Sequence, residues 1–113
     1  MKKIFFLIIV IAVGSSFQKK KPKQVLPACI SQKITVYKKM TEHERPQSIT
    51  EYIYKGKKVY YVAMACCDFF NELYDSNCVL LGHPDGGFTG RGDGKLPDFN
   101  AQKTKERLIW KTK

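Results

Sequence analysis

The chain has 113 residues, with 20 Lys and Arg against 10 Asp and Glu, a formal net charge of +10. This length is that of one small domain with a modest hydrophobic core, rather than of several domains. The basic excess favours anionic partners such as lipid headgroups or acidic polysaccharides, although lysines scattered over a surface would give the same charge. No specific nucleic-acid partner is expected.

Residues 1–16 have the pattern of a secretory signal peptide. Lys2 and Lys3 precede the apolar run Ile4–Val13, which is too short to anchor a bilayer, and the small residues Gly14–Ser16 follow it. We therefore expect a periplasmic or secreted protein without a membrane span after cleavage. Loss of the two leading lysines leaves 18 basic against 10 acidic residues, a net charge of about +8.

After a flexible lead-in at 17–27, we expect a single α+β domain at 28–113. A helical pattern begins at Ala28 and ends in the polar, proline-containing segment Thr41–Gln47. The apolar residues on one face of this helix recur at spacings of three and four: Ile30, Ile34 and Tyr37.

A β-hairpin is the clearest structural signal. The runs Ser48–Tyr54 and Lys58–Met64 are rich in Tyr, Ile and Val, and Lys55–Lys57 separates them with a central glycine. The tyrosines of the two runs are expected to hold the sheet together through cross-strand pairs rather than to form a ligand platform: Tyr52, Tyr54, Tyr60 and Tyr61.

The rest of the chain predicts shorter elements. Cys66–Tyr74 is interpreted as a compact aromatic segment with a helical turn, and Val79–Leu81 as a third strand. Asp98 can cap a helix that runs through Lys105, and Leu108–Trp110 is predicted as a final strand. The fold expected is a disulfide-stapled N-terminal helix packed on an antiparallel sheet of three or four strands.

Four cysteines in an exported chain predict two disulfides. Cys66 and Cys67 are neighbours, a vicinal bridge is strained, and adjacent side chains of an extended chain point to opposite faces. One of the two is therefore expected to bond Cys29 and the other Cys78, in an order that the sequence leaves open.

Several segments together resemble a family of small exported proteins of unknown function from Bacteroidetes-type bacteria. The resemblance implies a common fold and no assigned activity. The chain departs from the family pattern at Gly82 and Leu96, where similar sequences carry cysteines, and at Cys78, where glycine is usual. The matching segments are Glu51–Val62, Cys66–Asp75, His83–Gly94, Pro97–Phe99 and Leu108–Trp110.

The segment Gly82–Gly94 holds six of the eight glycines and is the strongest sequence candidate for a binding site. Its two carboxylates, Asp85 and Asp93, and its free backbone carbonyls suit calcium, which prefers six to eight oxygen ligands. The EF-hand spacing is absent, however, and Asp-Gly pairs are ordinary turn formers with positive φ at glycine. Turn formation in an Ω-like loop is the favoured alternative. The candidate binding residues are Asp85, Gly86, Gly87, Arg91 and Asp93.

The other motifs of the sequence give weaker indications of function than the glycine loop. The loop lacks the Lys-Ser/Thr pair of a nucleotide-binding P-loop, and the Arg-Gly-Asp tripeptide at 91–93 consists of ordinary turn residues. The cysteines lack the paired spacing of zinc sites and the C-x-x-C of redox enzymes, so no cofactor is expected. A dyad of Cys78 with His83 is conceivable but lacks a supporting motif.

The function expected is that of a monomeric, non-enzymatic binding or interaction module of the cell envelope. Its partner would be an anionic envelope component or another protein. The alternative is a metal-dependent or thiol enzyme that uses the glycine loop and the paired cysteines: Asp85, Asp93, Cys66, Cys67 and His83.

Export with cleavage can be tested by mass spectrometry of the protein made in its own host. The mature chain should begin between Ser15 and Lys20, because the small residues there suit signal peptidase. An intact Met1 on a membrane-bound form would contradict this.

Overall fold

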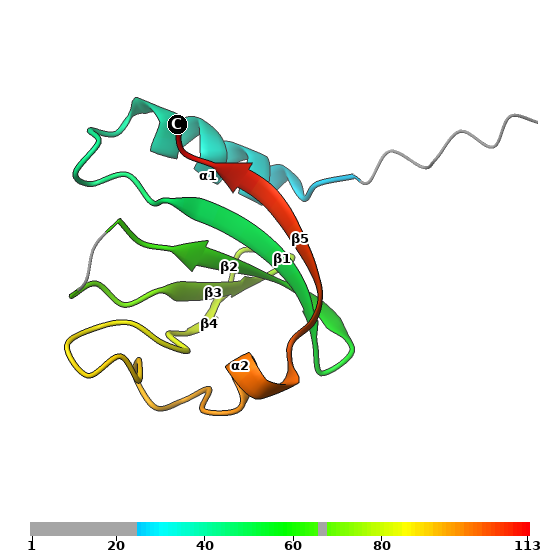
Figure 1. The fold of residues 1–113 in the computed structure, drawn as a ribbon. Helices are drawn as coiled ribbons and strands as arrows, with labels where there is room; N and C mark the ends of the chain where they lie inside the picture. Colours follow the sequence, from blue (N-terminus) through cyan, green and yellow to red (C-terminus); the bar gives the residue numbers. More distant parts are fainter. Residues whose placement is uncertain (1–24, 66–67) are drawn as a thin grey trace, which may run out of the picture.

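The computed structural model describes residues 25–65 and 68–113. One five-stranded antiparallel sheet forms the centre, in the order β4-β3-β2-β1-β5 (Figure 1). Within the described residues, no helix is long and apolar enough to cross a membrane. The elements in chain order are α1 (Ala28–Lys39), β1 (Ser48–Tyr54), β2 (Lys57–Ala63), β3 (Glu72–Asp75), β4 (Leu80–Gly82), α2 (Phe99–Gln102) and β5 (Thr104–Lys111).

Each face of the sheet carries its own apolar cluster. On one face, Ile30 of α1 is fully buried against Ile49, Tyr60 and Val62, which alternate with residues of the other face. On the other face, the segment between β4 and β5, including α2, covers the sheet, and Phe99 is fully buried there. Figure 1 shows α1 and the chain's C-terminal end on the first side, and α2 on the second.

The predicted helix and hairpin are confirmed. The helix ends at Lys39, where Met40 turns to extended backbone, ahead of the polar segment and Pro46. The hairpin turn consists of two residues, Lys55 and Gly56, both with positive φ. Two positive φ values define the type I′ turn, whose twist matches that of the flanking strands. The structural interpretation of the tyrosines also holds, because three of them are buried in the two clusters: Tyr52, Tyr54 and Tyr60.

The prediction of three or four strands was wrong, because the sheet has five. Glu72–Asp75 forms β3, where a helical turn was expected; it pairs with β2 and links β4 to the sheet. The helix expected from Asp98 through Lys105 is confined to Phe99–Gln102, and β5 begins at Thr104. Asp98 makes no side-chain capping bond, since its carboxylate accepts a hydrogen bond from the Tyr54 hydroxyl at 2.5 Å instead.

The expected cysteine pairing was also wrong. Cys29, in the first turn of α1, bonds Cys78, in the turn between β3 and β4, with 6.1 Å between the Cα atoms. Packing of α1 over the sheet brings the two residues together. The prediction rested on Cys66 and Cys67 being neighbours in the chain, which carries no information about this packing. The bridge closes a separation of 49 residues, which the chain-entropy model associates with about 4 kcal/mol of stabilisation. The two remaining cysteines of the prediction, Cys66 and Cys67, lie outside the described residues.

A buried carboxylate in β1 fixes the edge strand β5. Glu51 is 6% exposed and accepts hydrogen bonds from Arg107 of β5, at 2.8 and 3.3 Å, and from the Tyr60 hydroxyl of β2, at 3.0 Å. Burial alone would raise the pKa of this carboxyl, but the bonds from Arg107 and Tyr60 outweigh it and hold the pKa below its usual range. One side chain thus connects three adjacent strands.

Beyond Arg107, a bulge changes the direction of β5. Thr50 pairs with Leu108 and Ile49 pairs with Trp110, so Ile109 is an extra residue between two pairs. Regular alternation from Arg107 would turn Trp110 to the α2 face. The bulge places it opposite Ile49 instead, and it packs with Ile109 against the cluster beneath α1.

Candidate functional site

The two aspartates predicted as binding residues in the glycine loop, Gly82–Gly94, form hydrogen bonds with other residues of the protein. One carboxylate oxygen of Asp85 accepts from the Tyr61 hydroxyl at 2.7 Å and from the Asn71 amide at 2.8 Å. Its other oxygen accepts from the Asn100 amide at 3.0 Å. Asp85 therefore ties the loop to β2, to the segment before β3 and to α2.

Asp93 closes the other end of the loop. Its carboxylate accepts from the backbone N–H of Lys95 at 2.9 Å and of His83 at 3.1 Å, and the Lys95 bond above all lowers the pKa of Asp93. Gly86 bridges to both Phe70 and Arg91, whereas the Arg91 side chain itself is exposed. Asp93 therefore accepts backbone bonds as a turn residue does, the favoured interpretation of the sequence, whereas Asp85 accepts from side chains of distant segments instead.

The calcium and enzyme hypotheses gain no geometric support from this loop. In residues 25–65 and 68–113, no three His, Cys, Asp or Glu side chains lie together as a metal site. The conceivable Cys78–His83 dyad is wrong, because the Cys78 sulfur is bonded to Cys29. Ligand binding by the loop stays a prediction.

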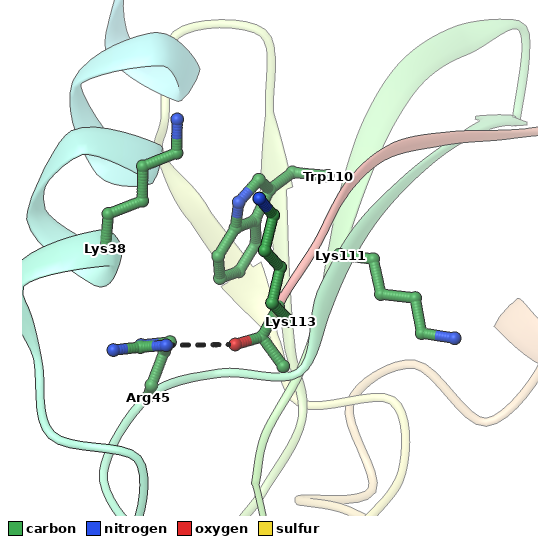
Figure 2. Close-up of a pocket in the computed structure, with 6 residues that line it drawn as sticks. Lys38, Arg45, Trp110, Lys111 and Lys113 are labelled. Atoms are coloured by element: carbon green, nitrogen blue, oxygen red, sulfur yellow. Dashed lines mark hydrogen bonds between the residues drawn. The ribbon is translucent and has the colours of Figure 1, made fainter.

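A second site, which we name the basic pocket, lies at the end of β5. Its cavity of about 470 Å³ is lined by residues from α1, from the segment before β1, and from β5 and the residues after it. Figure 2 shows Lys38 on the helix to one side of the Trp110 indole, Lys113 drawn across it, Arg45 below it, and Lys111 pointing away from it. The lining residues are Lys38, Arg45, Trp110, Lys111, Thr112 and Lys113.

Trp110 is the rigid wall of the basic pocket. The β5 bulge turns it toward α1, where its ring lies 6.0 Å from that of Tyr37, centroid to centroid, at an interplanar angle of 38°. Burial, assisted by Glu72, raises the pKa of Tyr37 to about 12, so this neighbour carries no negative charge at neutral pH. The indole N–H of Trp110 donates to no residue in the described part of the chain, and it belongs to a pocket whose other lining residues are mostly basic.

Arg45 supplies the most sheltered charge of the basic pocket. Its guanidinium donates to the Met40 carbonyl at 2.8 Å and to the Thr112 hydroxyl at 3.3 Å, which fixes the half-buried side chain. Its Nε atom is buried without a hydrogen-bond partner among the described residues. A buried donor without a partner costs about 1–3 kcal/mol.

No carboxylate in the described residues neutralises the basic pocket. All ten acidic residues of the sequence fall within those residues, and the ion pairs there are Arg107–Glu51 and Lys55–Asp98. The guanidinium of Arg107 lies 2.8 Å from the carboxylate of Glu51, whereas Arg45 forms no ion pair with a carboxylate among the described residues. The side chains of Lys38, Arg45 and Lys113 therefore border one cavity with no carboxylate side chain in an ion pair with them, whereas the Lys111 side chain points away from Trp110 (Figure 2).

Sequence reasoning missed this site. Arg45 lay in a segment interpreted only as a helix stop, and Lys111 and Lys113 in a basic tail. The available signal was a single tryptophan followed by two lysines in three residues, a pattern that many basic tails share. The contribution of α1 and of Arg45 depends on β5 pairing beside β1, which no local pattern reveals.

A family model described as Domain of unknown function (DUF6970) matches residues 35–112, more than half of the chain. The chain belongs to this family. The membership agrees with the resemblance to an uncharacterised family, and the matched region includes every residue of the basic pocket except Lys113. No curated protein and no solved structure matches this DUF6970 chain.

The structure sharpens the expected role of the loop glycines. Gly92 has φ +66°, and a Cβ there would lie 1.9 Å from the His83 carbonyl oxygen; Gly94 has φ +78° and nothing within 4 Å of that position. Gly94→Ala should therefore cost only the positive-φ strain, about 1–2 kcal/mol. Gly92→Ala must also displace the neighbouring backbone, so it should lower the free energy of unfolding by roughly 3 kcal/mol or more.

Urea unfolding of both glycine variants, with Lys95→Ala as the exposed control between the loop and α2, measures these differences. Equal unfolding free energies for Gly92→Ala and Gly94→Ala would show that the loop does not hold the backbone contact between Gly92 and His83.

Proposed function

We propose that this DUF6970 protein is an exported, non-enzymatic binding module of the cell envelope that binds an anionic group in the basic pocket. The signal-peptide pattern supports export, and the net basic charge of the mature chain supports an anionic partner. The family to which the chain belongs is described as one of unknown function, so the match assigns no activity that conflicts with this proposal.

The observation that carries the proposal is the unneutralised Arg45. Elsewhere in the described structure, Arg107 of β5 is paired with the buried carboxylate of Glu51. Arg45 is held in place by the Met40 carbonyl and the Thr112 hydroxyl, neither of which carries a charge. A guanidinium fixed beside an open cavity suits a phosphate or carboxylate, whose oxygens accept from its N–H groups.

An enzymatic role has weaker support. His83 lies 3.1 Å, through Nδ1, from the Asn71 carbonyl oxygen and stacks near Phe70, with ring centroids 5.2 Å apart. Asp85 and Asp93 accept hydrogen bonds from the protein, as described above. No side chain that lines the basic pocket is a carboxylate, histidine or cysteine that could act as a general base or nucleophile.

Inorganic phosphate tests the proposed function directly. We expect phosphate, titrated at constant ionic strength, to raise the melting temperature, because a ligand at ten times its Kd stabilises the folded state by about 1.4 kcal/mol. The variant Lys38→Gln/Lys113→Gln should lose most of this stabilisation. Both lysines are exposed, so their replacement should not disturb the core.

The matched control is Lys57→Gln/Lys95→Gln, which removes the same charge from exposed positions outside the basic pocket. It should respond to phosphate like the wild type. An equal response of all three proteins would mean that phosphate acts through net charge or solvent effects alone, and would contradict a site at the basic pocket.

A further inference from the structure

The size of the basic pocket points to a ligand larger than a single inorganic anion. Its volume of about 470 Å³ is within the range of pockets that hold small organic ligands, about 300–1,000 Å³. The three cations that border it come from three separate parts of the chain: α1, the segment before β1, and the residues after β5. Charge distributed around a cavity in this way suits a ligand with several acidic groups rather than one.

The walls of the basic pocket restrict the body of that ligand. Trp110 is the single aromatic residue of the lining, and no Val, Leu, Ile, Met or Phe lines the cavity, so an acyl chain would find no aliphatic surface beyond the stems of the basic side chains. A single-stranded nucleic acid is bound on successive aromatic platforms, whereas here one indole is available. The indole offers one flat apolar face and a polar N–H edge.

A sugar ring has the matching chemistry. The axial C–H groups of a pyranose pack on an aromatic face, while its hydroxyls accept from and donate to polar groups at the ring's edge. The indole of Trp110 packs against Tyr37 and the cluster beneath α1, and this packing lowers the entropic cost of ordering the ring on binding. The aliphatic stems of Lys38 and Lys113, which flank the indole in Figure 2, can cover the edges of the ring.

We infer that the ligand of the basic pocket is an acidic oligosaccharide, with a sugar ring packed on Trp110 and its acidic groups at Arg45 and the surrounding lysines. The inference rests on the proposed function, since it names the chemical class of anion that the same pocket takes. Arg45 would bind one acidic group directly, and Lys38 and Lys113 the groups of neighbouring sugar units.

Tetragalacturonate, which carries one carboxylate on each of four sugar rings, is a suitable probe. Because Trp110 is the only tryptophan of the sequence, its fluorescence reports directly on the basic pocket, and calorimetry supplies the Kd of variants. The matched probes are butane-1,2,3,4-tetracarboxylate, with similar charge and no sugar, and maltotetraose, with four sugars and no charge. All titrations use the full mature chain at pH 7.5 and constant ionic strength.

We expect tetragalacturonate to change the Trp110 emission and to bind at least tenfold more tightly than the tetracarboxylate, with no measurable binding of maltotetraose. Trp110→Leu should abolish the tenfold preference for tetragalacturonate and leave binding of the tetracarboxylate unchanged. Trp110→Phe keeps an aromatic ring and should retain part of the preference. The phenylalanine variant also controls for misfolding of the leucine variant. Lys57→Gln/Lys95→Gln should behave as the wild type.

The outcomes separate the two proposals. Equal Kd values for tetragalacturonate and the tetracarboxylate would overturn the saccharide inference and leave the anion-binding function intact. Tighter binding of a thymidine tetranucleotide than of tetragalacturonate would overturn it in favour of nucleic acid. If neither polyanion binds, and phosphate gives no pocket-dependent stabilisation, the proposed function fails as well.

Discussion

The buried carboxylate of Glu51 is the interaction on which the rest of the structure depends. A carboxylate removed from water is strongly destabilising unless charge and hydrogen bonds compensate it. Arg107 and Tyr60 supply that compensation from the two strands beside β1, so the satisfied carboxylate holds β5 and β2 in place at once. Loss of Arg107 would leave the charge buried with the Tyr60 hydroxyl but without a charged partner, at a cost of about 3–5 kcal/mol.

The basic pocket follows from this attachment of β5. With Arg107 fixed opposite Glu51, the extra residue Ile109 rotates the strand, and Trp110 comes to lie beneath α1 instead of on the opposite face. The residues that continue β5 then pass Arg45, whose guanidinium donates to Thr112. The Cys29–Cys78 bridge holds the start of the helix that contributes Lys38. Each wall of the pocket is thus positioned by a contact of the fold.

The strength of local signals explains what the sequence could predict. The hairpin has alternating β-branched and aromatic residues on both sides of a Lys-Gly turn, and α1 has apolar residues at helical spacing; both were predictable. The glycine loop was predictable as a set of turns, and its glycines at 86, 87, 90, 92 and 94 all have positive φ. These features depend on neighbours in the chain.

The features that were missed depend on distant partners. Strand β3 has four residues with an acidic residue at each end, and it is a strand because β2 and β4 pair with it. Strand β5 begins with Thr104, Lys105 and Glu106, exposed polar residues typical of an edge strand, so it lacks the apolar alternation of the hairpin. The Cys29–Cys78 bridge and the approach of Arg45 to Trp110 both arise from packing between segments far apart in sequence.

The central claim, that an anion binds at Trp110, is tested most directly by nuclear magnetic resonance. The single tryptophan gives one indole N–H signal in a ¹H–¹⁵N spectrum, and it can be followed as phosphate is added to the mature chain. We predict a saturable shift of this signal, shared by the Arg45 side-chain Nε–H and by the amides of Lys111 and Thr112. A stationary indole signal with saturable shifts in residues 83–94 would contradict the account and place anion binding in the glycine loop.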